Sequence, residues 1–380
     1  MPGPGVPQWA PGGVALSTAA YDQDHPRIVA DGAGGAIVTW EDGRSAATSW
    51  DIYAQRVDAA GAPQWTPDGV PLCTAPKGQG ATTIVADGAG GAIVAWTDYR
   101  RGGSGDIYAQ HVMAPGAVDP TWSANGVLVS VGGEYPTIVS DGAGGAIVTW
   151  GRDIYAQHVL PSGAMDPAWP ANGVPLCTAA NQFFPQIVSD GAGGAIVTWE
   201  DQRDLHSHIY AHHVLASGAV DPAWTANGVP LSTAGPYQTS PTIASDGAGG
   251  AIVTWTDYRS GTNYDVYAQR VYGAGAVAAV PPGDAPAHFQ FFAPSPNPTR
   301  DGRLSIRFSL PVSGQVSARL LDLAGHRVRT LATEREFSSG VQVLGWDGRD
   351  DAGAALPSGV YFVEVRVGTH SEARRAVLLH

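Results

Sequence analysis

Aromatic side chains in the connections between repeated β-rich runs are the residues best suited to bind a ligand. They are Trp50, Tyr21, His25, Tyr99, Tyr135, Phe183, Phe184, His206, Tyr237 and Tyr264. Exposed aromatic rings offer large, rigid faces that can stack on sugar rings and other flat ligands. Trp50 is the best single candidate, because it is the only tryptophan of the repeats that lies outside the repeated pattern. The alternative is that Trp50 packs onto a neighbouring loop.

A series of polar side chains enters the first strand of every repeat. It consists of Gln23, Gln79, Glu134, Gln182 and Gln238. Because amides both donate and accept hydrogen bonds, an axial ring of such groups at the mouth of a channel could hold a polar ligand or an ion. The alternative is that these side chains satisfy backbone groups of the adjoining loops.

Charge pairs of the form Asp-x-Arg follow the second strand in four copies. They are Asp42/Arg44, Asp98/Arg100, Asp201/Arg203 and Asp257/Arg259. A pair that recurs from copy to copy favours a structural tie over catalysis. Cys73 and Cys177 occupy the same place two copies apart, so we expect buried, apolar thiols and no disulfide.

One local cluster has metal-capable side chains. It contains His206, His208, His212 and His213, with Asp204 nearby. Alternation along a strand puts His208 and His212 on one face and His213 on the other, so the cluster cannot converge on one ion. We therefore predict no metal site and no cofactor. A glycosidase would need two carboxylates about 5 to 10 Å apart, for which Asp22, Asp24 and Glu134 are the available residues, but we assign no catalytic residue.

Five copies of one unit position these side chains. The string Asp-Gly-Ala-Gly-Gly-Ala-Ile-Val begins at Asp31, Asp87, Asp141, Asp190 and Asp246. In the first copy the glycines form a hairpin between strands at 27–30 and 36–40, and strands at 51–57 and 69–73 follow. Repeats of this length are typical of propellers and arrays.

The two ends of the repeat region contain complementary fragments. The last copy stops after its third strand near Val271, whereas the chain begins with a fourth-strand pattern, Trp9 followed by residues 13–17. We predict an all-β protein in which residues 1–275 form a five-bladed β-propeller and the N-terminal strand completes the last blade. Further copies upstream of Met1 would enlarge the ring.

Turns that are the same in all copies lie at one end of the predicted ring, and connections that differ lie at the other. Because a repeated blade needs the same turns for folding, the variable end is free to serve binding. The third copy has almost no connection between its second and third strands, only Gly151-Arg152-Asp153. We therefore expect a notch at blade 3 on the variable end.

Composition limits the classes of partner. The 380 residues, 44% of them hydrophobic, are enough for two domains, and the net charge of −13 would repel nucleic acid. No apolar run reaches the ~18 residues of a membrane span, and the first 20 residues lack a signal-peptide pattern. A linker at 276–290 precedes alternating runs that predict a small β-sandwich over 291–380.

Four motifs of the C-terminal region carry a family resemblance. They are Pro294-Ser295-Pro296-Asn297-Pro298, Leu321-Asp322-Leu323-Ala324-Gly325, Trp346-Asp347-Gly348-Arg349-Asp350 and Ser358-Gly359-Val360-Tyr361-Phe362. This region resembles the Ig-like domain of the flagellar hook-capping family and is similar to the type IX secretion C-terminal sorting domain. The resemblance implies export or anchoring by this domain. The repeats resemble uncharacterised propeller-type repeats of bacterial surface proteins, which implies a location and no activity.

Three functions remain open from the sequence. We expect a monomeric, secreted or outer cell-surface protein that is not an enzyme and that presents its variable aromatic end to an extracellular glycan or protein ligand. One alternative is a glycoside hydrolase with axial carboxylates. The other is a structural or adhesive repeat protein without a small ligand.

Overall fold

The structure is a computed structural model with two compact units, Met1–Ala278 and Ala279–His380. It describes residues 9–45, 49–203, 206–232, 237–273, 289–292, 294, 297–299, 304–310, 312–337, 340–368 and 370–379. Its secondary structure consists of β-strands and turns over these residues, and no helix that could span a membrane occurs among them. Most of the predicted linker at 276–290 lies outside the described residues.

Each repeat forms an antiparallel β-sheet, which we call a blade. Blade 1 contains β1 (Gln23–Ala30), β2 (Ala36–Asp42), β3 (Asp51–Val57) and β4 (Val70–Cys73), and blade 2 contains β5 (Gln79–Ala86), β6 (Ala92–Asp98), β7 (Asp106–Val112) and β8 (Val127–Ser130). Blades 3 and 4 share one six-stranded sheet of β9 (Glu134–Ser140), β10 (Ala146–Val159), β11 (Val174–Ser189), β12 (Ala195–Asp201), β13 (His208–Val214) and β14 (Val229–Ser232). Blade 5 contains β15 (Gln238–Ser245), β16 (Ala251–Asp257) and β17 (Asp265–Val271).

The repeated glycine-rich turn explains why every blade begins in the same way. The Asp31 carboxylate accepts hydrogen bonds from the backbone N–H groups of Ala33 and Gly35, both at 2.8 Å. A Cβ on Gly35 would lie 2.2 Å from the Val57 carbonyl oxygen, so only glycine fits there. The same carboxylate contacts recur at Asp87, Asp141, Asp190 and Asp246.

The Asp-x-Arg pairs tie the strands of a blade together, as predicted. In blade 4, buried Asp201 accepts hydrogen bonds from the Trp199 indole at 2.8 Å and from Arg203 at 2.6 and 2.7 Å. The Arg203 guanidinium lies 4.0 Å above the Tyr210 ring, and Trp199 stacks on the same ring. Burial raises the pKa of Asp201, but the hydrogen bonds from Arg203 and Trp199 outweigh burial and leave the pKa below its ordinary value.

Tryptophans of the fourth-strand segments join neighbouring blades. The Trp65 indole of blade 1 donates to the Ala114 carbonyl of blade 2 at 3.0 Å and lies against Gly116, where a Cβ would be only 2.3 Å from the ring. Trp122, Trp169 and Trp224 repeat the hydrogen bond to the next blade. The hydrophobic core lies between blades, where Ile37 and Ile52 of blade 1 pack with Val94 and Trp96 of blade 2.

The predicted closure of the ring by the N-terminal segment is not present. Trp9 donates to the Ala59 carbonyl of blade 1 at 3.1 Å, and the Thr18 backbone N–H donates to the Asp68 carboxylate at 2.7 Å. The segment thus contacts blade 1 as each fourth-strand segment contacts the next blade, but no described strand pairs with the outer edge of β17. Val266 on β17 is 80% exposed, whereas its counterpart Ile209 is fully buried.

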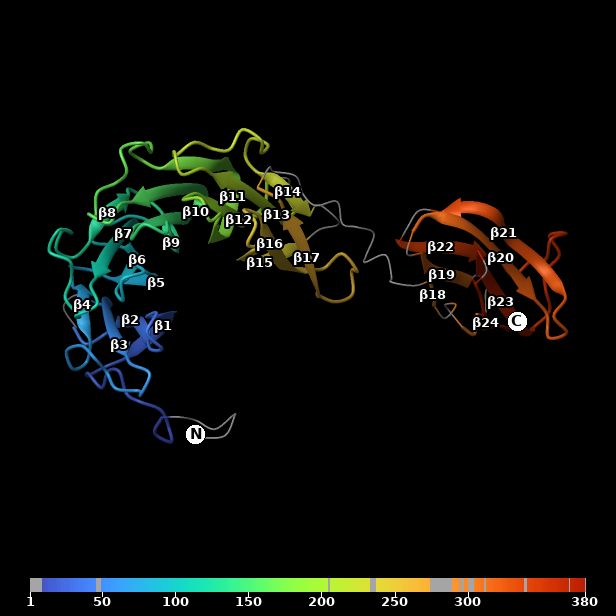
Figure 1. Ribbon diagram of the computed structural model, residues 1–380, viewed down its shortest axis with the longest axis horizontal. Helices are drawn as coiled ribbons and strands as arrows, with labels where there is room; N and C mark the ends of the chain where they lie inside the picture. Colours follow the sequence, from blue (N-terminus) through green and yellow to red (C-terminus); the bar gives the residue numbers. More distant parts are fainter. Residues whose placement is uncertain are drawn as a thin grey trace. The chain divides into compact units, whose positions relative to one another are not determined.

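The five blades therefore follow one another along an open arc in the structure (Figure 1). Among the described residues, side chains of blade 5 that would pack against a neighbouring blade in a closed ring, such as Val266 and Ile252, are exposed. A closed ring of five blades stays a prediction.

The second unit packs two sheets around one core. One sheet has the order β18 (Gln290–Phe291), β19 (Leu304–Leu310), β22 (Gly340–Trp346), and the other has the order β21 (Arg327–Phe337), β20 (Gly314–Leu321), β23 (Gly359–Val367), β24 (His370–Leu378). Ile306 and Phe308 from the first sheet and Val316, Leu320 and Val363 from the second are fully buried in this core. The unit is a small β-sandwich, as predicted.

Replacing Asp201 tests the buried charge pair. Asp201→Asn leaves the Arg203 guanidinium without its ionic partner, so we expect the free energy of unfolding to fall by about 3 kcal/mol. The measurement is the shift of the denaturant midpoint of the full chain. Asp153→Asn is the matched control, because Asp153 is exposed, and it should shift the midpoint little. Equal shifts for both variants would contradict the structural role of the pair.

Candidate functional site

A bulge repeated in the innermost strand of each blade places one residue per blade in a left-handed conformation. The residues are His25, Ala81, Tyr135, Phe184 and Ser240, each six positions before the turn aspartate, with φ between 50° and 56°. The strand register shifts at the bulges of β1, β5, β11 and β15, and also where β9 pairs with β10. Bulges of this kind re-aim side chains and are common beside binding sites.

Three of these residues line a groove along the inner strands. The groove encloses about 330 Å³ and is lined by Arg27, Ala81, Thr82, Thr83, Tyr135, Pro136, Thr137, Phe184, Pro185 and Gln186. These residues come from β1, β5, β9 and β11, so the groove crosses four blades. Tyr135 is 62% exposed and Phe184 is 59% exposed. The groove thus offers two aromatic side chains, the Arg27 guanidinium and the Thr83 hydroxyl group, and no carboxylate is among its lining residues.

The other predicted aromatic residues are spread over the variable end. Tyr21, Tyr237 and Tyr264 are largely exposed, and Tyr99 and Phe183 are exposed to a smaller extent. The His206 and Tyr237 rings are tilted by 37° to each other with centroids 6.4 Å apart, and the ring centroids of Tyr264 and Tyr258 are 4.9 Å apart. His25 is exposed, with its Nδ1 3.4 Å from the Glu41 carboxylate.

Trp50, the residue that the sequence favoured most, is only half-buried rather than fully exposed. Its ring lies against the backbone of Gly43, where a Cβ would be 3.5 Å from the indole. Its carbonyl oxygen accepts a hydrogen bond from the Gln79 backbone N–H at 2.8 Å. These contacts favour the alternative interpretation, in which Trp50 packs onto the neighbouring loop.

The predicted axial ring of amides is not formed. Gln79, Gln182 and Gln238 are buried, and Gln79 donates to the Ala75 and Lys77 carbonyls of its own loop. Gln23 donates in the same way to Ala20 and Tyr21, Gln182 donates to Ala179, and Gln238 bonds the His208 ring at 2.8 Å. Glu134 forms an ion pair with Arg152 at 3.2 Å. Gln23, Gln79 and Gln182 thus satisfy carbonyl groups of their own loops, which was the alternative interpretation.

The histidines of blade 4 diverge, as strand alternation predicted. His213 bridges the carboxylates of Asp190 and Asp221 at 3.0 and 2.8 Å, a position filled by His111 in blade 2 and His158 in blade 3. His212 is buried against Trp224, with ring centroids 6.0 Å apart. Asp204 lies outside the described residues. The two cysteines are free and buried, and burial raises the pKa of Cys73 to about 12 and that of Cys177 to about 11.

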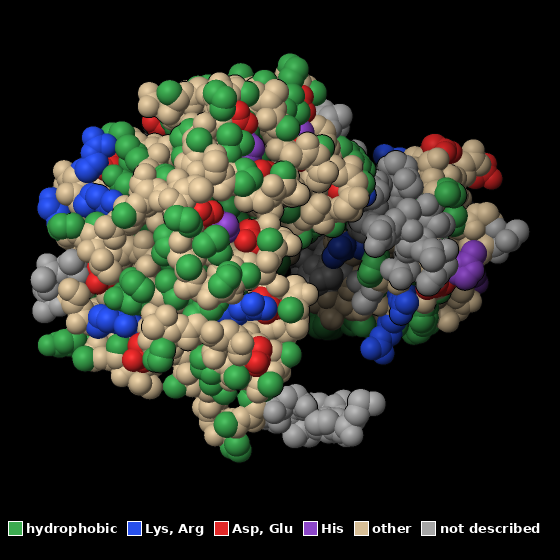
Figure 2. All heavy atoms as spheres, turned by 60° about the vertical axis from the view of Figure 1, so that its left-hand side comes forward, with side chains coloured by type: hydrophobic (Ala, Val, Ile, Leu, Met, Phe, Trp, Pro, Cys, Tyr) green, Lys and Arg blue, Asp and Glu red, His purple; other side chains and the backbone are tan. Residues whose placement is uncertain are grey.

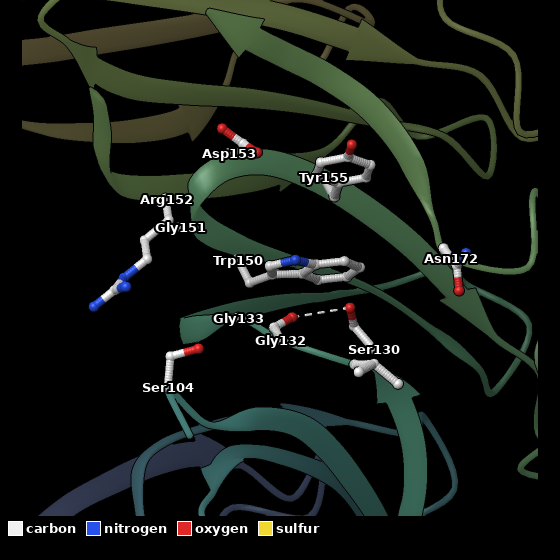
Figure 3. A pocket seen from close by; sticks show the side chains of 11 residues that line it. Ser104, Ser130, Gly132, Gly133, Trp150, Gly151, Arg152, Asp153, Tyr155 and Asn172 are labelled. Atoms are coloured by element: carbon white, nitrogen blue, oxygen red, sulfur yellow. Dashed lines mark hydrogen bonds between the residues drawn. The ribbon is translucent and has the colours of Figure 1, made fainter. Parts of the chain in front are cut away.

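A second cavity of about 470 Å³ lies at blade 3, where the sequence predicted a notch. Its lining includes Ser130, Val131, Trp150, Tyr155 and Asn172. The second and third strands of this blade join without a loop inside β10, and no Asp-x-Arg pair follows Trp150. Figure 3 shows the indole of Trp150 and the ring of Tyr155 facing the cavity side by side, with the Arg152 side chain directed away from both. The two rings stack with centroids 6.1 Å apart and planes 9° apart.

Charged side chains do not gather on the face shown in Figure 2. Acidic and basic groups are scattered there between hydrophobic and neutral side chains. This face therefore has no continuous basic surface. The net charge of the chain is −13.

Comparison with known proteins gives one family match. Residues 297–371 match the FlgD Ig-like domain. The match covers most of the C-terminal β-sandwich, on which the resemblance to the flagellar hook-capping family rested. No curated protein matches the chain.

Several solved structures are similar to the chain at low identity. A protein of unknown function from Dyadobacter fermentans is 8% identical, with a TM-score of 0.43 over 88% of this chain and 96% of its own. PorZ, a surface component of the type IX secretion system of Porphyromonas gingivalis, is 11% identical, with a TM-score of 0.23 over 91% of this chain and 56% of its own. An α-L-arabinanase from Penicillium chrysogenum is 12% identical, with a TM-score of 0.32 over 79% of this chain and 92% of its own. All three TM-scores lie below 0.5, so we draw no functional argument from them.

His212 makes the stability of blade 4 depend on pH. Burial lowers the pKa of His212 to about 4, whereas an unfolded histidine titrates near 6.5. Between these pH values the unfolded chain binds the proton more readily, so this residue lowers stability as the pH falls from 6.5 to 4. His212 accepts a hydrogen bond from the backbone N–H of the next residue, His213. In the other blades a glutamine holds this position and accepts the equivalent hydrogen bond. These glutamines are Gln55, Gln110, Gln157 and Gln269.

We therefore expect His212→Gln to stabilise the chain at pH 5 by roughly 2 kcal/mol more than it does at pH 8. Denaturant unfolding of the full chain at the two pH values measures this difference. His326→Gln, an exposed substitution in the C-terminal unit, serves as the control. A gain that is the same at both pH values would show that His212 is not buried in its neutral form.

Proposed function

We propose that this chain is an exported or surface-attached binding protein that takes an extracellular glycan in the groove of its inner strands. The observation that carries this proposal is the repeated bulge, which holds Tyr135 and Phe184 exposed on adjacent blades beside one groove. Holding a bulky aromatic residue at positive φ is unfavourable, and it persists where the surrounding structure or a function requires it.

The chemistry of the groove suits a neutral sugar polymer. Aromatic faces stack on the apolar faces of sugar rings, and the hydroxyl group of Thr83 can exchange hydrogen bonds with sugar hydroxyls. A groove that crosses several inner strands suits an extended ligand better than a compact one. The match of the C-terminal unit to the FlgD Ig-like domain supports a role for that unit in export or attachment.

The hydrolase alternative has less support. Hydrolysis of a glycosidic bond needs two carboxylates in different environments near the same bond. Glu134 is paired with Arg152, and Asp24 is exposed and bonds the His25 backbone N–H at 2.7 Å. Neither lines the groove, which contains no carboxylate among its lining residues.

A binding screen of the full chain against soluble glycans and polysaccharides tests the proposal. We expect one class of neutral polysaccharide to bind, and Tyr135→Ala and Phe184→Ala each to weaken binding about tenfold through loss of a stacking face. Trp50→Ala should have a smaller effect, because its ring is already engaged with Gly43.

Tyr272→Ala is the matched control, since Tyr272 is also exposed but lies at the opposite end of blade 5 from the variable loops. It should leave binding unchanged. No binding to any glycan would favour a structural or adhesive role. Release of reducing sugar from a bound polysaccharide would favour the hydrolase.

A further inference from the structure

In four blades, an arginine of the same blade covers the tyrosine ring of the third strand. In each, the guanidinium carbon lies 3.7 to 4.0 Å from the centre of a tyrosine ring of the third strand: Arg44 over Tyr53, Arg100 over Tyr108, Arg203 over Tyr210 and Arg259 over Tyr267. The preceding aspartate accepts a hydrogen bond from the tryptophan indole of the second strand at 2.8 to 2.9 Å. Aspartate and arginine thus cover a tryptophan and a tyrosine together.

The guanidinium has two further hydrogen-bond partners. One is a backbone carbonyl of the residue three positions after the fourth-strand tryptophan, which accepts from Arg44, Arg100 and Arg203 at 2.7 Å. The other is a serine or cysteine from the fourth strand of the preceding blade, such as Cys73 beside Arg100 at 3.1 Å or Ser232 beside Arg259 at 3.2 Å. The guanidinium therefore bridges two blades.

In blade 3 the residues equivalent to those that contact the guanidinium are present, but the arginine is absent. Tyr155 supplies the ring, Ser130 is the fourth-strand serine of blade 2, and Asn172 stands three positions after Trp169. All three line the cavity of about 470 Å³. The Trp150 indole nitrogen, which has an aspartate acceptor in the other four blades, makes no hydrogen bond within the described part of the chain.

The chain cannot fill the cavity with its own nearest arginine. Arg152 follows Trp150 by two positions, whereas Arg100 follows Trp96 by four, so Arg152 lies within β10 and not in a loop after the strand. Its side chain is directed away from the rings and pairs with Glu134 at 3.2 Å (Figure 3). The position that an aspartate would occupy to accept from Trp150 is taken by Arg152 itself.

We propose that the cavity at blade 3 binds an arginine side chain of a partner polypeptide, presented in an Asp-x-Arg segment like those of the other four blades. The partner's guanidinium stacks on Tyr155 and bonds to Ser130 and Asn172, and its carboxylate accepts from the Trp150 indole. Guanidinium suits this place better than ammonium, because its planar fork stacks on a ring while it donates in several directions. The cavity volume also leaves room for the backbone that joins the two side chains.

The charge of the molecule favours the arginine end of such a ligand. The chain carries a net charge of −13, which attracts cations over the range of its field. Asp153 also lines the cavity and is exposed, so it can add an ionic contact. None of the residues used here lines the inner-strand groove, so this proposal stands independently of glycan binding.

Titration calorimetry of the full chain with N-acetyl-Gly-Asp-Gly-Arg-Gly-amide tests the proposal. We expect one site, with binding at least tenfold weaker when lysine replaces the arginine of the peptide. N-acetyl-arginine amide should bind more weakly than the peptide, because it lacks the carboxylate. If the peptide and N-acetyl-arginine amide bound with equal affinity, the proposal that the guanidinium comes from an Asp-x-Arg polypeptide segment would be wrong. If neither bound, the proposed binding site itself would be wrong.

Two pairs of variants locate the binding. Tyr155→Leu should weaken binding of the peptide about tenfold, whereas Tyr108→Leu, the same change in a blade that has its own arginine, should not. Because Tyr155→Leu could disturb folding, the exposed Val131 at the cavity wall provides a second test. Val131→Glu should tighten binding and Val131→Arg should weaken it, each about threefold. Identical affinities for these two variants would overturn the proposal.

Discussion

The buried carboxylate of the Asp-x-Arg pair is the interaction on which each complete blade depends. It lies at the end of the second strand, and it fixes the tryptophan of that strand and the arginine of the following loop. Through the arginine it also holds the tyrosine of the third strand and a carbonyl of the fourth-strand segment. One ionised group therefore organises all the outer strands of a blade, and burial makes each of its hydrogen bonds count for more than it would in water.

The same interaction explains where cavities do and do not occur. In blades 2, 4 and 5 the arginine fills the space between the blade and the preceding one, and in blade 1 it fills the space beside Ser17 of the N-terminal segment. In blade 3 the shortened connection removes both partners of the charge pair, and a cavity opens at that place. The blade that lacks this internal tie therefore has the larger of the two cavities described in the repeat region, about 470 Å³ against about 330 Å³ for the inner-strand groove.

Much of the architecture could be predicted from the sequence, because repeats allow internal comparison. The strands of blade 1 begin and end close to the predicted ranges, and the notch at Gly151 and the tie between Asp201 and Arg203 follow from comparing copies. The bulge was missed, although Pro26, Pro136, Pro185 and Pro241 each follow a bulge residue and signal a break in strand pairing. The role of the glutamines could not be decided, since an amide that faces a channel and one that bonds its own loop have the same spacing. Closure of the ring depends on packing across blade faces that no local pattern specifies.

The interfaces between blades are not joined by the same set of hydrogen bonds. Between blades 1 and 2 the Asn125 side chain accepts a hydrogen bond from the Thr74 backbone N–H, and Asn227 and Thr178 form the same link between blades 3 and 4. Between blades 2 and 3 the equivalent residues, Asn172 and Val131, form no such bond within the described residues, and the bridging arginine is absent too. The interface between blades 2 and 3 therefore lacks two links that the interface between blades 1 and 2 has. A ligand in the cavity, which is lined by residues of both blades 2 and 3, would replace these missing links.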